Sequence, residues 1–170
     1  MTLRRESKLR GRRLRIDEAL LERFAMSKAG LQFLLKVAPK VDKVVIPRTK
    51  GKFSSTGFNK VGLVTTTGAK SGLPRTQPLV VIDDGDGLLL IASNYGRPHH
   101  PSWSHNLEAN PRCEVEFRGP KAPYRAQRLE GEERAEAWAT AVDFYAGYER
   151  YEANCAPREI RLYRLRPAMP

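Results

Sequence analysis

Hydrophobic residues recur with two different periods along this chain, a helical one near the N-terminus and a strand-like one after it. Between Ile16 and Ala38 the apolar residues return every three or four positions, and Pro39 follows the last of them. This spacing predicts an amphipathic helix with a basic outer face. The sequence therefore divides into a flexible basic arm at 1–15, an amphipathic helix and a connection at 16–60, and a strand-rich domain at 61–170.

The strand-rich domain shows short apolar runs separated by turn-forming residues. Two helices interrupt these runs, one at 102–109 that Asn110 and Pro111 end, and one at 132–154 that is broken near Gly147. Because the first strands follow each other without a crossover helix, an antiparallel sheet is favoured over a parallel one. The pattern predicts an α+β, mainly β, fold: a small antiparallel barrel with flanking helices. Its six predicted strands span 61–67, 77–83, 88–92, 112–118, 124–130 and 160–165.

Charge is distributed unevenly over the chain, whose net charge is +11. Residues 1–60 hold 16 Lys and Arg against 5 Asp and Glu, whereas residues 61–170 are electrically balanced. A basic arm attracts nucleic acid or anionic membranes, and equally it can be a solvated tail. Residues 1–23 contain no aromatic side chain, so no nucleic acid is expected. Peripheral membrane contact through residues 1–38 fits the amphipathic helix better.

Cys113 and Cys155 lack a CxxC spacing and are expected to be free thiols in a reducing compartment. No apolar run approaches the length of a membrane span, and no secretion signal is recognised. We therefore expect a cytoplasmic protein, with the inner face of the plasma membrane as the surface available to its basic N-terminus. No metal is expected, because His99, His100 and His105 do not have the spacing of a known zinc site.

The connection between the first two strands gathers cations, hydroxyl groups and glycines in the sequence TTTGAKSGLPRTQ. Gly68 and Gly72 allow backbone angles that turn N–H groups toward an anion, and Lys70 and Arg75 add positive charge. The spacing is not that of a Walker A loop. The connection is therefore either an anion site or an exposed turn with solubilising charges. Hydroxyl donors for an anion are available from Thr67, Ser71 and Thr76.

Four motifs in the order TTTGAKSGLPRTQPLVV, IASNYG, HPSWSHNLEANP and FYAGYERY resemble the deazaflavin-dependent nitroreductase family, over residues 61 to about 166. The resemblance implies a split β-barrel, similar to FMN-binding split barrels, and coenzyme F420 as the cofactor. The implied activity is F420H2-dependent hydride transfer to a quinone, an enone or a nitroaromatic compound. Proteins of this family occur mainly in actinobacteria.

The resemblance also implies roles for individual residues. The phosphate and acidic tail of F420 would be held by Lys70, Ser71, Arg75 and Gln77. The deazaflavin ring would lie against Ser93, Asn94, Tyr95, Gly96 and Trp103, and the HPxWxxNL segment includes Pro101 and Asn106. The substrate would face Tyr145, Tyr148 and Tyr151, and Tyr148 together with Ser93 would polarise or protonate it. The chain departs from the family at Ala69, where a basic residue is frequent, and at Tyr95.

Two alternatives remain at this point. FMN, with its single phosphate, would suit the same cationic turn. A module without enzymatic activity, which carries a cofactor or a lipophile and docks to a membrane through its basic N-terminus, is also compatible with the sequence. The oligomeric state is open at this point, with a homodimer as one candidate because small split barrels often pair.

Overall fold

The computed structural model describes Val41 and residues 61–168. The predicted arm at 1–15, the segment at 16–60 except Val41, and the proposed membrane-contact residues 1–38 lie outside the described residues.

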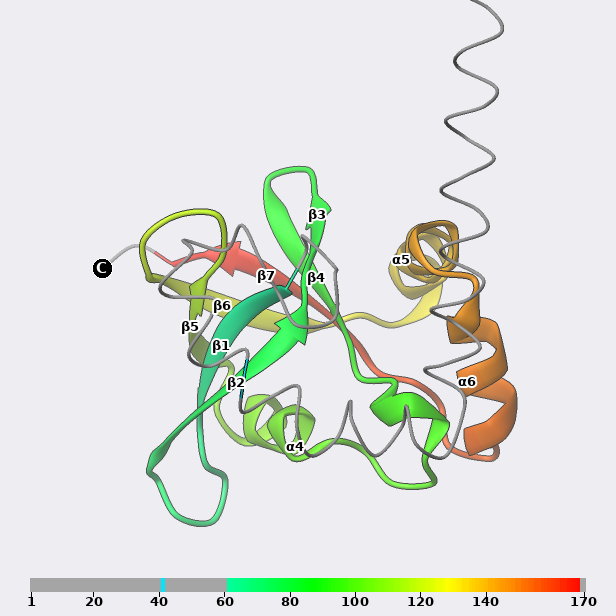
Figure 1. The fold of residues 1–170 in the computed structure, drawn as a ribbon, viewed down its shortest axis with the longest axis horizontal. Helices are drawn as coiled ribbons and strands as arrows, with labels where there is room; N and C mark the ends of the chain where they lie inside the picture. Colours follow the sequence, from blue (N-terminus) through cyan, green and yellow to red (C-terminus); the bar gives the residue numbers. More distant parts are fainter. Residues whose placement is uncertain (1–40, 42–60, 169–170) are drawn as a thin grey trace, which may run out of the picture. The chain divides into compact units, whose positions relative to one another are not determined.

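Residues 61–168 form one antiparallel sheet of seven strands with helices beside it (Figure 1). The strand order is β2-β1-β5-β6-β7-β4-β3. The strands are β1 (Val61–Thr67), β2 (Pro74–Val80), β3 (Ile82–Asp84), β4 (Gly87–Ile91), β5 (Arg112–Glu116), β6 (Ala122–Arg128) and β7 (Leu162–Pro167). The helical elements are η2 (Asn94–Gly96), α4 (Ser102–Ala109), α5 (Gly131–Phe144) and α6 (Gly147–Cys155).

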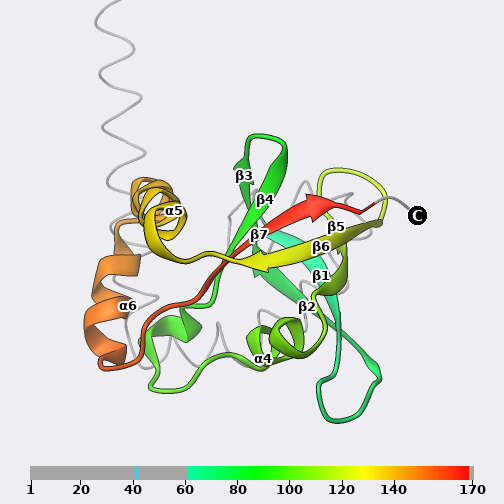
Figure 2. The ribbon, with the colours of Figure 1, turned by 180° about the vertical axis from the view of Figure 1, so that it is seen from behind.

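The prediction of six strands is wrong, because the strand predicted at 77–83 is divided at Val81. β2 pairs with β1 and β3 pairs with β4, so the partner changes at this one residue. β2 and β3 are also the two edges of the sheet. A single buried residue therefore joins both edges, and the sheet has to curl for this link to be made (Figure 2).

The hydrophobic core lies on the inner face of this curled sheet and is closed at one end by α4 (Figure 1). Trp103 and Leu107 of α4 belong to the same buried cluster as Val64 of β1 and Val115 of β5. Burial of these large apolar side chains stabilises the fold and fixes α4 against β1 and β5.

Several predicted elements are confirmed closely. β1 and α4 have the predicted bounds, and the predicted long helix is broken between Phe144 and Gly147. β3 and β4 are joined by a two-residue turn in which Gly85 has a φ of 66°. A positive φ at this position suits the tight hairpin turns that match the twist of the strands.

Candidate functional site

The turn between β1 and β2 is attached to helix α4 by Asn106. The side-chain carbonyl of Asn106 accepts a hydrogen bond from the N–H of Ala69 at 2.9 Å, and its amide donates to the hydroxyl of Thr66 at 2.9 Å. Asn106 and Thr66 are both buried. Since buried hydrogen bonds are costly to break, this side chain fixes the turn relative to the sheet.

The glycines of this turn shape its backbone, and their own N–H groups form hydrogen bonds within the turn. The N–H of Gly68 donates to the carbonyl of Leu73 at 2.9 Å, and the N–H of Gly72 donates to the carbonyl of Gly68 at 2.8 Å. A Cβ on Gly68 would lie 2.6 Å from the hydroxyl oxygen of Ser71, and Gly72 has a φ of 65°. Within the described residues, the N–H groups of Lys70 and Ser71 are the ones in this turn without a partner.

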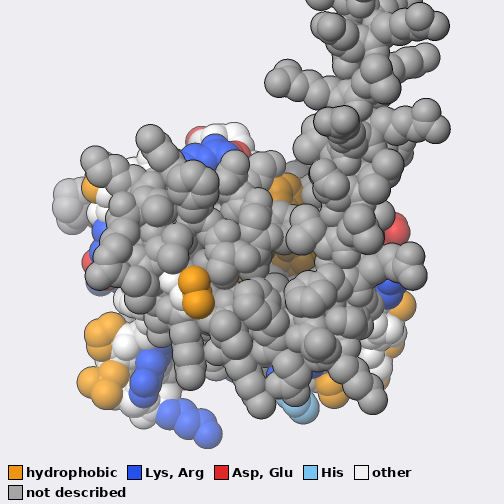
Figure 3. All heavy atoms as spheres, viewed as in Figure 1, with side chains coloured by type: hydrophobic (Ala, Val, Ile, Leu, Met, Phe, Trp, Pro, Cys, Tyr) orange, Lys and Arg blue, Asp and Glu red, His pale blue; other side chains and the backbone are white. Residues whose placement is uncertain are grey.

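Lys70 and Arg75 carry the positive charge of the turn, and both are exposed. In the described part of the chain, neither has a carboxylate within 4.0 Å. Arg75 donates a long hydrogen bond of 3.4 Å to the hydroxyl of Ser71. Figure 3 shows Lys and Arg side chains, in blue, at the surface on the lower left, where Figure 1 draws the β1–β2 turn. The two cations are therefore available to an anionic ligand.

The strand register places two of the predicted ligand-binding residues on the inner face of β2. Arg75 lies opposite Thr66 and Gln77 lies opposite Val64, and residues that face each other across a pair of strands share a face. Thr76 is on the other face, where its hydroxyl makes a 2.8 Å hydrogen bond with the hydroxyl of Thr65. The structure therefore places Arg75 and Gln77 on one face of β2, with Ser71 in contact with Arg75, and Thr76 on the other face.

The predicted ring-binding segment forms a left-handed turn between β4 and α4. Asn94, Tyr95 and Gly96 have φ values of 49°, 56° and 71°, and the amide of Asn94 donates to the carbonyl of His99 at 2.8 Å. A Cβ on Gly96 would lie 3.0 Å from the Cα of Tyr151, so its backbone packs against α6.

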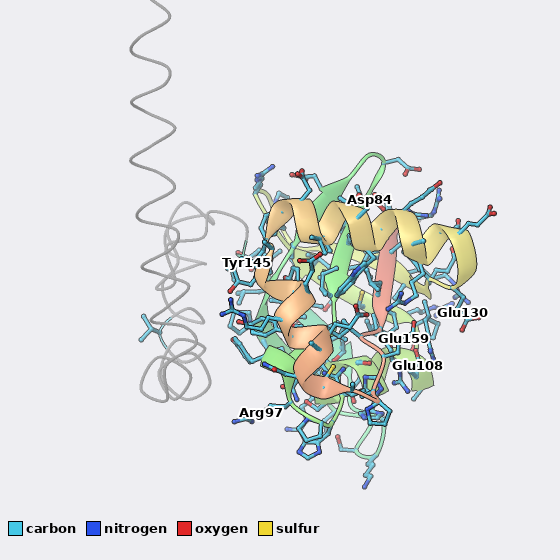
Figure 4. All side chains as sticks on the ribbon, turned by 90° about the vertical axis from the view of Figure 1, so that its right-hand side faces the viewer. Asp84, Arg97, Glu108, Glu130, Tyr145 and Glu159 are labelled. Carbon is cyan, nitrogen blue, oxygen red and sulfur yellow. The ribbon has the colours of Figure 1, made fainter. Side chains whose placement is uncertain are left out.

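Four tyrosines from two parts of the chain form a cluster, which we call the tyrosine cluster. The ring centroid of Tyr145 lies 5.3 Å from that of Tyr148 and 6.0 Å from that of Tyr151. Tyr95, from the left-handed turn, meets Tyr151 edge-on at 6.2 Å. Figure 4 shows Tyr145 at the junction of α5 and α6. Gly147 leaves room for its ring, because a Cβ there would overlap the Tyr145 side chain.

Burial controls the ionisation of the cluster. Tyr148 and Tyr151 are each 5% exposed. Desolvation raises the pKa of the Tyr148 phenol above its usual range, and the neighbouring Tyr145 and Tyr95 raise it further. Desolvation also raises the pKa of Tyr151, followed by a hydrogen bond with Tyr145. Both phenols therefore keep their protons at neutral pH and can donate hydrogen bonds.

Trp103 is the predicted ring-binding residue that the structure places in the core. It is 4% exposed, and its ring lies 5.6 Å from that of Tyr163 at an angle of 63°. Pro101 caps the helix that carries it. Trp103 therefore packs α4 onto the core beside Tyr163.

Sequence reasoning did not identify Arg158, whose side chain donates to the carbonyls of Ala92, Ser93 and Arg97. It is one of four arginines between residues 158 and 166, and no sequence signal distinguishes it from the other three. Asn106 belongs to one of the sequence motifs, but its link to the β1–β2 turn is visible only in the structure.

Other features of the described residues bear on alternative functions. Within them, no group of three or more His, Cys, Asp and Glu side chains is arranged to hold a metal ion. Cys113 and Cys155 are buried free thiols, and burial, followed by the charge of Glu114, raises the pKa of Cys113 to about 12. A search of these residues for a helix long and apolar enough to cross a bilayer finds none.

Comparisons with known proteins agree with the motifs. A family model described as F420H(2)-dependent quinone reductase matches residues 41–163. An F420H(2)-dependent quinone reductase of Mycobacterium tuberculosis is 51% identical over 59 residues, which are 35% of this chain and 39% of that protein. The chain thus matches less than half the length of that curated relative.

Solved structures show the same relationship. A structure of an F420H2-dependent reductase, FDR-A, is 38% identical with a TM-score of 0.57, and the match covers 62% of this chain and 93% of that one. A second structure, described as a domain-swapped dimer, is 32% identical with a TM-score of 0.59 and covers 74% and 96% of the two chains. The family name favours coenzyme F420 over FMN. Because the family model matches well over half of the sequence, the chain belongs to the F420H(2)-dependent quinone reductase family.

Proposed function

We propose that this protein binds reduced coenzyme F420 and catalyses hydride transfer to an electrophilic small molecule, with quinones as the leading substrate class. The observation that carries the proposal is the family match, because residues 41–163 contain every residue of the predicted site. Enones and nitroaromatic compounds are further candidates, since they also accept a hydride at an electron-poor carbon or nitrogen.

The corner at the β1–β2 turn suits the charged end of the cofactor. F420 ends in a phosphodiester and several carboxylates, which require cations and N–H donors. Lys70 and Arg75 supply the cations, and in the described part of the chain neither is neutralised by a carboxylate. The N–H groups of Lys70 and Ser71 and the amide of Gln77 are additional donors. We assign the anchoring of the phosphate and acidic tail to these residues.

The tyrosine cluster suits the substrate side of the reaction. Bound F420H2 supplies the hydride, and conversion of a quinone to its hydroquinone also consumes one proton. Tyr148 holds its proton at the phenol oxygen at neutral pH, because burial raises its pKa. We assign to Tyr148 a hydrogen bond that polarises the substrate oxygen, with the hydroxyl of Ser93 as a second donor. Tyr145 and Tyr151 would form the apolar walls beside a planar substrate.

The proposal extends to the whole molecule. The link between the two sheet edges at Val81 supports a split β-barrel of the FMN-binding type. A homodimer is part of the proposal, because one related structure is described as a domain-swapped dimer. We also propose a cytoplasmic location with peripheral membrane contact through residues 1–38, which the basic charge of the N-terminal part supports.

A fluorescence titration with F420 tests the anchoring role of Lys70. Lys70→Ala is expected to raise the Kd about tenfold, the loss of ~1.4 kcal/mol that one charge-assisted hydrogen bond contributes. The matched control is Lys121→Ala, since Lys121 is exposed and pairs with Glu114 instead. An equal Kd for Lys70→Ala and wild type would reject the anchor. Failure of the wild type to oxidise F420H2 with any quinone would reject the proposed activity.

A further inference from the structure

The left-handed turn at Asn94–Gly96 has a backbone that its own sequence does not favour. Three consecutive residues have φ between 49° and 71°, and two of them carry side chains. This region of φ is unfavourable for side-chain-bearing residues, more so for Tyr than for Asn, and is normally visited by single residues. A run of this kind persists only where surrounding groups hold it, and such runs cluster at functional sites.

The guanidinium of Arg158 supplies three of the groups that hold the turn. Its Nη2 donates to the carbonyl of Ser93 at 2.7 Å, its Nη1 to the carbonyl of Ala92 at 3.2 Å, and its Nε to the carbonyl of Arg97 at 3.0 Å. Ser93 immediately precedes the turn and Arg97 immediately follows it. Arg97 lies beside the C-terminal end of α6, from which Arg158 reaches (Figure 4). One planar fork therefore joins both ends of the turn.

A fourth contact involves His100. Nη1 of Arg158 lies 3.3 Å from Nδ1 of His100. A guanidinium can only donate, so Nδ1 is the acceptor and the imidazole is neutral. Desolvation and the charges of Arg161 and Arg158 lower the pKa of His100 to about 4, which agrees with the neutral form. The loop is thus attached to Arg158 by a side chain as well as by its backbone.

Arg158 is itself fixed to the end of α6. Its N–H donates to the carbonyl of Cys155 at 2.9 Å, and the thiol of Cys155 donates to the carbonyl of Arg158 at 3.2 Å. In the described part of the chain no carboxylate lies within 4.0 Å of its guanidinium. Its hydrogen-bonding capacity is directed at the loop instead of at an ion pair.

The left-handed conformation of the Asn94–Gly96 turn determines the contacts that the turn makes with α6. Gly96 packs its backbone against Tyr151, and the ring of Tyr95 meets the ring of Tyr151 at 6.2 Å. If the turn relaxed to ordinary backbone angles, Tyr95 would leave the tyrosine cluster and Ser93 would shift with it.

We propose that Arg158 is a positioning residue that holds the Asn94–Gly96 turn in its left-handed conformation, and so keeps Tyr95 in contact with Tyr151 and fixes the backbone of Ser93. The catalytic consequence rests on the proposed function. The structural part does not, and it can be tested without any ligand.

Amide hydrogen exchange of the full chain tests the structural part. The N–H of Gly96 donates to the carbonyl of Ser93, and the N–H of Arg97 to that of Asn94, both at 3.1 Å, so these two amides report on the turn. In Arg158→Ala both are expected to exchange at least about tenfold faster, because charge-assisted hydrogen bonds that hold the turn are lost. The amides of β4 and β7 should keep their rates. Arg158→Lys, which keeps the charge and loses the fork, is expected to resemble Arg158→Ala.

The catalytic part is measured with F420H2 and a soluble naphthoquinone. Arg158→Ala and Arg158→Lys are expected to lower kcat/KM for the quinone about tenfold, as expected for misplacing groups that contact the reactants. The control is Arg150→Ala, which removes an exposed arginine of α6.

The outcomes separate the two proposals. Unchanged exchange at Gly96 and Arg97 in both variants overturns the positioning role, whatever the activity. Faster exchange that extends equally to β4 and β7 also overturns it, because Arg158 would then contribute only general stability. A wild type without F420H2 oxidation refutes the proposed function and leaves the exchange result to decide the positioning role.

Discussion

Asn106 connects the β1–β2 turn to α4, and its loss should affect both stability and the proposed F420 binding. Asn106→Ala leaves the buried hydroxyl of Thr66 and the N–H of Ala69 without their partner. We expect a decrease of about 1–3 kcal/mol in the free energy of unfolding. We also expect weaker F420 binding, because the turn that carries Lys70 loses its attachment to α4. Urea unfolding and fluorescence titration measure the two effects.

The control for that change is Asn110→Ala at the other end of α4. Asn110 is only partly buried, and its side chain accepts one hydrogen bond, from the N–H of Arg112 at 3.1 Å. The Asn110→Ala substitution should leave F420 binding unchanged. If both variants bound F420 like the wild type, the turn would not depend on its link to α4.

His100 predicts a pH dependence of stability whose direction follows from its environment. Desolvation lowers its pKa from 6.5 to about 4, and the charges of Arg161, Arg158, His105 and Arg128 add to the effect. Between pH 6.5 and 4 the unfolded chain binds more protons at this position than the folded chain. The free energy of unfolding therefore falls as pH decreases through this window, by less than about 1.4 kcal/mol per pH unit from this group.

Replacement of His100 by Gln should remove this contribution. Urea unfolding at pH 7, 5.5 and 4.5 is expected to show a smaller loss of stability for His100→Gln than for wild type. His99→Gln, at an exposed neighbouring position, should behave like wild type. Parallel curves for all three proteins would mean that His100 titrates normally in the folded state.

At the residue scale, sequence motifs suggest candidate members of the site and do not show the contacts that these residues make. The cations Lys70 and Arg75 could be recognised because the chemistry of an anion requires such side chains. The role of Arg158 could not, because it depends on three carbonyls that are about 60 positions earlier in the chain. The sequence also could not show which amides of the turn have internal partners, since the N–H groups of Gly68 and Gly72 bond within the turn.

At the element scale, the break between α5 and α6 creates the space for the tyrosine cluster. Gly147→Ala adds a Cβ where the ring of Tyr145 lies. Helix propensity alone predicts that this change stabilises the protein by up to about 1 kcal/mol. We expect the opposite, a lower melting temperature and a changed near-ultraviolet circular dichroism signal, because the ring has to move away from Tyr148 and Tyr151.

Gly119→Ala is the control for Gly147→Ala. A Cβ on Gly119 meets only the carbonyl of Phe117 at 4.0 Å, so this change reduces the freedom of the unfolded chain without a clash. A Gly147→Ala protein at least as stable as this control would show that the Tyr145 ring does not need the glycine.

Elements were predictable where local signals define them. α4 ends at Asn110 and Pro111, and its predicted bounds are confirmed. The apolar run through Val81 suggested one strand, because the sequence contains no signal that the pairing partner changes there. The division into β2 and β3 follows from the curl of the whole sheet, which is a tertiary property.

At the scale of the whole molecule, charge and chemistry occupy different parts of the sequence. Residues 1–60 carry the entire net charge of +11, and residues 61–170 contain all predicted site residues at a net charge of zero. Two variants can therefore be compared that lose the same amount of charge, one in residues 1–60 and one in residues 61–170. The comparison separates a local membrane contact from a general effect of net charge. A control set that lowers the charge by four in the described residues consists of the exposed arginines Arg97, Arg112, Arg125 and Arg150.

Replacement of Arg4, Arg5, Arg12 and Arg13 by Gln in the full chain should weaken sedimentation with anionic liposomes at least about tenfold, because each basic residue near such a surface contributes roughly 1 kcal/mol. The control set should weaken it much less, since its arginines belong to the neutral part of the chain. Raising the salt concentration should release the wild type, because surface charges are screened within about 10 Å at 0.1 M. Equal losses in both variants would assign the attraction to net charge, and a wild type that stays in solution would remove membrane contact from the proposal.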